Sequence, residues 1–216
     1  MLTRFVCLAN SFKEGGRCIA GIFLDRDNNP VIENGRPKWV RPISNSIHGE
    51  VYTHLVAHLH ILDIVEIKIT AYPELSYQSE NVLFNENSIK AIGKFNKGDL
   101  KGICDDNPVI FGNKGKAVHH EKIESIDHSL MLIHVADFDV VKKTGDDPDK
   151  PKLRLVFSYH RTEYDFPITD PAFSQRYQTN PAFLQDTKEL FLCLSLGIEL
   201  NDWHYKLVAG IVRVDH

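Results

Sequence analysis

The chain has 216 residues and a formal net charge of −4 at pH 7. This length allows one large β domain or two small ones, and a hydrophobic content of 43% is typical of a packed globular protein rather than a disordered one. Proteins that hold nucleic acid by charge alone are usually basic, so any nucleic-acid role here requires a local basic patch.

The cysteines and the N-terminus indicate a reducing compartment. The chain has four cysteines, no C-x-x-C pair and no apolar stretch of membrane-spanning length. Cys7, Cys18 and Cys193 stand in apolar runs, which favours buried free thiols. The opening MLTRFVCLANSFKEGG does not resemble a secretory leader. We therefore expect a cytoplasmic protein without a membrane partner.

The first third of the chain is typical of a β protein. Its apolar runs and alternating patterns predict strands at 3–9, 17–25, 38–44 and 61–70, and a short helix within 50–59. The third strand is expected to end near Pro42, because proline supplies no N–H to a strand ladder. From Tyr72 to about Lys122 the pattern breaks at glycines and predicts short helices and loops, with Asn87 or Ser88 as a helix cap.

The second half carries a clearer β pattern. Residues 129–141 predict one strand, 142–152 a polar turn, and 152–169 a hairpin with a tight turn near Arg161. Two helix starts follow, DPAF at 170–173 and NPAF at 180–183, in which Asp170 and Asn180 are expected to cap the first turns. Residues 190–197 and 204–214 predict two further strands.

Two short strings almost repeat each other at the two ends of the chain. RCIAGI occupies 17–22 and KLVAGI occupies 206–211, each with a glycine in mid-strand, Gly21 and Gly210. Mid-strand glycines are unfavourable unless a bend or a close backbone approach requires them, and small barrels use them at bends. One such strand in each half favours two small barrels, and the alternative is a chance match between two short apolar strings.

The order of several motifs resembles a known family. TRFVCLANSFKEGGRCIAGI, KWVRPIS, LDIVEIKI, QSEN, TEYDFPITDPAF, LCLSLG and HYKLVAGI follow one another as in the dual OB-containing domain family. The resemblance covers nearly the whole chain and implies a mainly β fold with short helices (α+β), built as two OB-like small β-barrels. It also implies a prokaryotic protein of a defence or conflict system that senses nucleic acid or nucleotides, and it transfers no catalytic residue.

The domain organisation follows from that resemblance. We expect the first OB-like barrel in residues 1–122, with a helical and loop insertion from about residue 72, and the second barrel in residues 123–216. OB barrels bind oligonucleotides on their second and third strands and the adjoining loops. Proteins that bind single strands combine a basic groove with exposed aromatic rings.

The third predicted strand carries the first candidate contacts. Lys38, Trp39 and Arg41 stand together, and a period of two places Trp39 and Arg41 on one face, where a ring can stack on a base and a guanidinium can bind a phosphate. The alternative is a packed tryptophan beside a surface arginine paired with an acid.

Two hairpin tips and a lysine-bearing segment are further candidates. Arg161 and Tyr164 lie near one tip, and His204 and Lys206 near the other. Solvated turns are the alternative for both. The possible patch between residues 90 and 116 consists of Lys90, Lys94, Lys97, Lys101, Lys114 and Lys116. Spaced lysines are also common on a face that only contacts water.

Nothing in the sequence requires a metal, a cofactor or catalysis. His54 and His58 are four residues apart, as in the zinc-binding motif H-E-x-x-H. However, the glutamate of that motif is missing, and no third ligand stands at a spacing typical of a metal site. Neither a G-x-S-x-G elbow nor a phosphate-binding loop occurs. The leading hypothesis is a non-catalytic module that binds single-stranded nucleic acid or a nucleotide. The alternatives are a subunit that docks a partner protein through strand edges and hairpins, and a nucleotide enzyme whose site one sequence does not reveal.

Overall fold

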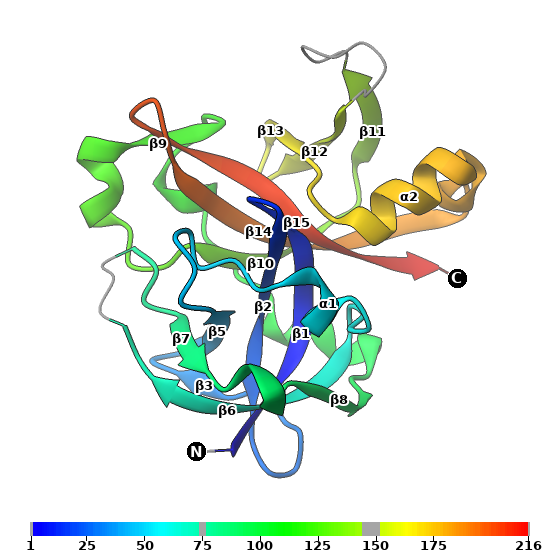
Figure 1. Ribbon diagram of the computed structural model, residues 1–216. Coiled ribbons are helices and arrows are strands. Elements are labelled where there is room, and N and C mark those ends of the chain that lie inside the picture. Colours follow the sequence, from blue (N-terminus) through cyan, green and yellow to red (C-terminus); the bar gives the residue numbers. More distant parts are fainter. Residues whose placement is uncertain (1, 74–76, 144–151, 216) are drawn as a thin grey trace.

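The computed structural model describes residues 2–73, 77–143 and 152–215. Most of the polar turn expected at 142–152 lies outside these ranges. In the described part, no helix is both long and apolar enough to cross a bilayer. The fold is mainly β with short helices, as predicted, and it contains two barrels that pack against each other (Figure 1).

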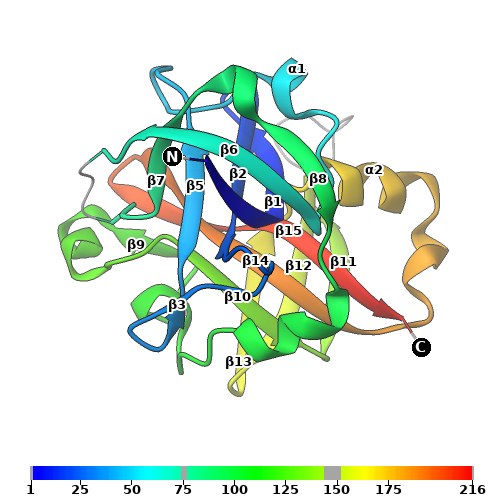
Figure 2. The same ribbon diagram turned by 90° about the horizontal axis from the view of Figure 1, so that it is seen from below.

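Five strands close the first barrel. They are β1 (Leu2–Lys13), β2 (Gly16–Leu24), β5 (Trp39–Ile43), β6 (Asp63–Ala71) and β7 (Asn81–Phe84). They pair in the order β1-β2-β5-β7-β6, and β6 pairs again with β1, which closes the barrel (Figure 2). The β5–β7 pair is parallel and the others are antiparallel. The short helix α1 (Thr53–Val56) precedes β6, so strand order and helix position agree with an OB barrel.

Short elements lie around and after this barrel. The two-residue strands β3 (Ile32–Glu33) and β4 (Arg36–Pro37) pair with each other, and β8 (Lys90–Lys94) pairs with β6. The 3-10 helices are η1 (Glu86–Ser88), η2 (Lys97–Ile103), η3 (Ile110–Gly112) and η4 (His120–Ser125). The expectation of helices and loops after Tyr72 was therefore incomplete, because β7, β8 and β9 (Ala117–His119) also lie there. Asn85 caps η1, so the expected caps at Asn87 or Ser88 were wrong.

The second barrel repeats the OB strand order in a more open form. Its elements are β10 (Leu130–Val135), β11 (Phe138–Lys143), β12 (Lys152–Tyr159), β13 (Thr162–Pro167), α2 (Pro171–Thr179), η5 (Pro181–Leu184), β14 (Thr187–Leu200) and β15 (Trp203–Asp215). The single strand expected at 129–141 is two, because β10 pairs with β14 whereas β11 pairs with β12. Only a parallel bridge from Ile168 to Val208 joins the β11–β12–β13 sheet to β15 in the described part of the chain.

Local signals in the second half were partly right. Asp170 Oδ1 accepts a hydrogen bond from Phe173 N at 3.0 Å and so caps α2, whereas Asn180 makes no side-chain cap. The tight turn between β12 and β13 has positive φ at His160 and Arg161. β9 precedes residue 122 but pairs with β15, so this strand belongs to the second sheet.

A shared core joins the two barrels. The outward side chains of β2 and β5, including Ala20, Ile22 and Trp39, pack in one cluster with Leu132 and Cys193 of the second barrel. Burial of these apolar side chains stabilises the interface between the two barrels, here called the seam, by the hydrophobic effect. The outer face of β2 and β5, where an OB barrel ordinarily presents its ligand surface, is therefore an internal interface in this protein.

Candidate nucleic-acid interface

The pair on β5 does not lie at the surface. Trp39 and Arg41 share one face of the strand, as their spacing predicts, but the second barrel covers that face and only 2% of Arg41 is exposed. The Trp39 indole N–H is buried and has no hydrogen-bond partner among the described residues. The expectation that these two side chains meet a ligand on an open face is therefore corrected.

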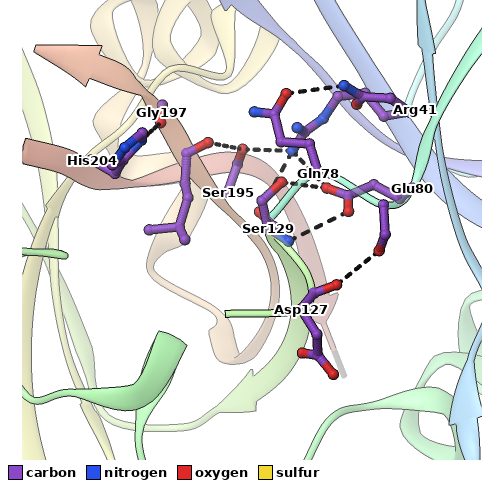
Figure 3. Close-up of polar contacts among 11 residues, drawn as sticks. Arg41, Gln78, Glu80, Asp127, Ser129, Ser195, Gly197 and His204 are labelled. Carbon is purple, nitrogen blue, oxygen red and sulfur yellow. Dashed lines mark hydrogen bonds and ion pairs between the residues drawn. The ribbon is translucent and has the colours of Figure 1, made fainter. Parts of the chain in front are cut away.

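Arg41 belongs to a buried polar cluster at the seam (Figure 3). Its Nη2 lies 3.3 Å from Glu80 Oε1 and donates to Ser195 Oγ at 3.2 Å and to the carbonyl of Ser129 at 3.5 Å. Glu80 also accepts a hydrogen bond from the Ser129 hydroxyl. Arg41 and Glu80 come from the first barrel and the two serines from the second, so the cluster connects the barrels.

The other predicted contacts are scattered. Lys38 is half-buried and pairs with Glu33 at 3.1 Å, and Arg161 is exposed at its turn. Tyr164 is buried inside the second barrel. His204 is buried as well, with Nδ1 3.0 Å from the carbonyl oxygen of Gly197. Apart from the Trp39–Arg41 face and the Tyr164–Lys206 contact, the structure does not bring the seven predicted residues together.

Lys206 is fully buried in the second barrel. Its ammonium donates to the carbonyls of Ile110 and Asn113, at 2.6 and 2.7 Å, and to Asn113 Oδ1 at 3.0 Å. Nζ also lies 5.9 Å from the centre of the Tyr164 ring. Burial lowers the pKa of Lys206 from an ordinary 10.5 to about 7. This lysine therefore holds the segment before β9 against β15 instead of facing a ligand.

That pKa predicts how stability depends on pH. The unfolded chain keeps the Lys206 proton to about pH 10, whereas the folded chain releases it near pH 7, so unfolding takes up a proton between these values. The contribution of Lys206 to the free energy of unfolding should therefore rise with pH in this window, by up to about 1.4 kcal/mol per pH unit. Urea denaturation between pH 6.5 and 9.5 should show this rise in the natural protein and not in Lys206→Met. Parallel curves for the two proteins would contradict it.

A basic cleft opens elsewhere, between the barrels on the side of α1 and α2. Its cavity is about 550 Å³, and its walls come from β1, β2, the turn after α1, η2, α2, η5 and β15. The cationic side chains that line it are Arg17, Lys97, Arg176 and Arg213. Four distant segments supply these charges, so a local positive site forms on a chain with net negative charge.

Few carboxylates balance this charge. Among the described lining residues, Asp170 supplies the one carboxylate. Its Oδ1 and Oδ2 accept hydrogen bonds from the backbone N–H groups of Phe173 and Ile211, and burial raises its pKa. In the described part of the chain, Arg17 and Lys97 form no ion pair within 4 Å. The positive potential of the basic cleft is therefore only weakly offset.

Aromatic rings accompany the guanidinium groups. The guanidinium carbons of Arg176 and Arg213 lie 4.8 and 4.7 Å from the centre of the Phe183 ring. Arg17 lies 4.6 Å from the ring centre of Phe12, which is 60% exposed at the tip of β1. A planar guanidinium fixed on a ring keeps its charge and offers a flat surface to a base.

Most residues of this cleft were not predicted from the sequence. Only Lys97 was among the candidates, as one of the spaced lysines, and two others of that group, Lys90 and Lys94, are paired with Glu66 and Asp63. Arg176 follows the first helix start and Phe183 ends the second, but these motifs predict helices and indicate nothing about charge. No spacing along the chain indicates that Arg17 lies opposite them, because the packing of the barrels creates the cleft.

Two overlapping groups of side chains have the composition of a metal site. They are His119, His120 and Glu121, and His120, Glu199 and Asp202, with ligand atoms within 4.8 Å of one another. His119 Nδ1 already accepts a hydrogen bond from Glu121 N at 3.4 Å, and the carboxylates are exposed. We assign no metal to these groups.

Two packed barrels with OB strand order and a basic cleft between them define a dual-OB protein. The chain belongs to the dual OB-containing domain family, whose model matches residues 3–211. Nearly the whole chain is thus accounted for by one family, as the motif order predicted.

No curated protein matches the chain. Among solved structures, a replication protein A heterotrimer bound to ssDNA is 10% identical with a TM-score of 0.37. The match covers 100% of this chain, which spans about half (48%) of the other. The structure described as the molecular basis for abrogation of activation of pro-inflammatory cytokines is 10% identical, with coverages of 99% and 92% and a TM-score of 0.35. The tetrameric p202 HIN2 is 8% identical, with the same coverages and a TM-score of 0.32. Likeness at this level carries no functional argument.

Proposed function

We propose that this protein is a non-catalytic module that binds single-stranded nucleic acid in the basic cleft. The observation that carries the proposal is the set of four cationic side chains, Arg17, Lys97, Arg176 and Arg213, around one cavity on an otherwise acidic protein. Cations held at a groove neutralise phosphates and release counterions, which is the main source of affinity for a nucleic-acid backbone.

A single strand suits this cleft better than a duplex. Arginines stacked on Phe183 and Phe12 provide planar surfaces for unstacked bases, and such surfaces are available only to a strand whose bases are not paired. The cavity of the cleft is only about 550 Å³, which favours a thin, flexible ligand. Binding of this kind tolerates many sequences, because every base has a stacking face.

Charge reversal in the cleft should weaken binding. For the double variant Lys97→Glu/Arg176→Glu, we expect at least about tenfold weaker binding of a labelled single strand. The slope of log affinity against log salt should also become less steep, by about 0.7 for each phosphate that the protein no longer neutralises. Fluorescence anisotropy titrations with RNA and DNA at several salt concentrations measure both quantities.

The matched control is Lys68→Glu/Lys122→Glu, which changes the net charge by the same amount, since Lys68 of β6 and Lys122 of η4 are exposed lysines that do not line the basic cleft. It should retain most of the affinity. Equal losses in this control and in the cleft variant would mean that net charge, not the cleft, attracts the strand. Absence of binding at low salt would refute the proposal.

Docking of a partner protein by strand addition has less support. The outer strand β8 is fully exposed, but Lys90 and Lys94 on it pair with Glu66 and Asp63 of β6. Lysines on an edge strand discourage pairing with another chain. A role as a sensor in a prokaryotic defence system, and a cytoplasmic location, belong to the same proposal. The first rests on the family resemblance and the second on the sequence composition, not on the cleft.

A further inference from the structure

A second cavity lies at the seam, next to the Arg41 cluster. It has a volume of about 340 Å³, within the range of ligand pockets. The β1–β2 hairpin of the first barrel forms one side, and the β14–β15 hairpin of the second barrel forms the other. Neither barrel makes this seam pocket alone, and no expected site residue except Arg41 lines it.

Buried polar groups line part of the seam pocket. They are Ser11, Arg41, Gln78 and Ser195, each at most 6% exposed. Arg41 Nε is buried without a hydrogen-bond partner among the described residues. A buried donor without a partner is costly, so a ligand acceptor that reached it would be stabilised.

The seam pocket has no excess of positive charge. Its lining cations are Lys13 and Arg41, its lining acids are Glu14 and Glu199, and Arg41 is already paired with Glu80. The basic cleft differs, since its cations outnumber its one carboxylate residue. A pocket without excess positive charge offers little to a phosphate and more to a neutral ring that forms hydrogen bonds.

The walls of the seam pocket suit a flat ring. Phe12 and Tyr205 supply aromatic faces, and Leu196 and Leu207 supply apolar surface. Phe12 also connects the two sites, because the guanidinium that lies 4.6 Å from its ring centre belongs to Arg17 of the basic cleft. A strand that leaves the cleft over Arg17 therefore reaches the mouth of the seam pocket.

We propose that the seam pocket receives one unstacked nucleobase of the strand whose backbone lies in the basic cleft. This inference rests on the proposed function. The cleft binds phosphates, and the seam pocket stacks one base between apolar walls while polar side chains meet its edge. Because both barrels form the pocket, base binding would also depend on how they are packed together.

Cys18 offers a direct test, since its half-buried thiol lines the seam pocket. Cys7 and Cys193 are buried, and burial raises the pKa of Cys104 to about 12, so Cys18 is the thiol expected to react with iodoacetamide. With a single-stranded oligonucleotide at about ten times its Kd, the alkylation rate of Cys18, followed by mass spectrometry, should fall about tenfold by mass action. An abasic strand of equal length should bind without protecting Cys18.

Two variants separate the pocket from the cleft. Tyr205→Ala should lose protection of Cys18 by the normal strand while it binds the abasic strand as before, and the exposed Tyr72→Ala should behave like the natural protein. Strand binding by anisotropy without protection of Cys18 would overturn the base pocket and leave the proposed function intact. Protection by free nucleosides without strand binding would refute the proposed function and support the pocket. If the strand does not bind and Cys18 is not protected, both proposals are refuted.

Discussion

Arg41→Ala should lower the free energy of unfolding by about 3–5 kcal/mol, because it leaves the Glu80 carboxylate buried without its cation. Only 3% of the Glu80 side chain is exposed, and the Ser129 hydroxyl would remain as its side-chain partner. The same change removes the hydrogen bonds of Arg41 to Ser195 and to the Ser129 carbonyl, so the seam itself should loosen. Urea denaturation followed by circular dichroism measures the effect.

The matched control removes both charges of this pair. Arg41→Met combined with Glu80→Gln should recover most of the stability, because buried ion pairs are often replaceable by neutral groups whereas one charge left alone is not. If Arg41→Ala were as stable as the natural protein, Arg41 would not be the structural partner of Glu80. The outcome also decides how a binding defect in Arg41→Ala is interpreted, since partial unfolding alone would produce one.

Apolar runs and alternation along the sequence predicted many of the strands. They fail to predict a strand that has no buried face. β1, β2, β12 and β13 have apolar alternation or long apolar runs, because each buries side chains in a barrel. β8 is exposed along its whole length, so no alternation marks it. The break between β10 and β11 was also missed. It is a two-residue bend at Ala136–Asp137, after which the chain pairs with β12 instead of β14.

The candidate site was harder to predict, because burial at the seam is a tertiary property. A period of two placed Trp39 and Arg41 on one face, but only the packing of the second barrel shows that this face is covered. Lys206 has the sequence context of a hairpin tip and yet lies in a core with three oxygen acceptors. The basic cleft depends on the same packing, so it has no signature along the chain.

The standard OB surface helps to explain why the candidate sites lie where they do. In the first barrel, the outer face of β2 and β5 is used to hold the second barrel. In the second barrel, the outward side chains of β12 and β13 include Arg154 and Asp165, which pair with each other. Exposed charge and aromatic rings are combined at the edges of the seam instead, where the two barrels meet.

Gly210→Ala should be severely destabilising, because Gly210, like Gly21 in the similar strand near the N-terminus, allows a close backbone contact. A Cβ at Gly210 would lie 1.9 Å from the carbonyl oxygen of Leu8, and one at Gly21 would lie 1.8 Å from that of Val6. Gly210 thus permits β15 of the second barrel to touch β1 of the first, whereas Gly21 permits a contact inside the first barrel. Backbone atoms cannot turn away as side chains do, so we expect a loss of about 3 kcal/mol or more.

Gly93→Ala is the matched control, since Gly93 is also a mid-strand glycine but its nearest neighbour would be 3.7 Å from the added Cβ. It should change the free energy of unfolding by less than about 0.5 kcal/mol. The seam pocket offers a second readout, because a displaced β15 should raise the alkylation rate of Cys18 in Gly210→Ala even under conditions where the variant is folded. If Gly210→Ala had the same free energy of unfolding and the same Cys18 alkylation rate as the natural protein, β1 and β15 would not lie as close together as this packing requires.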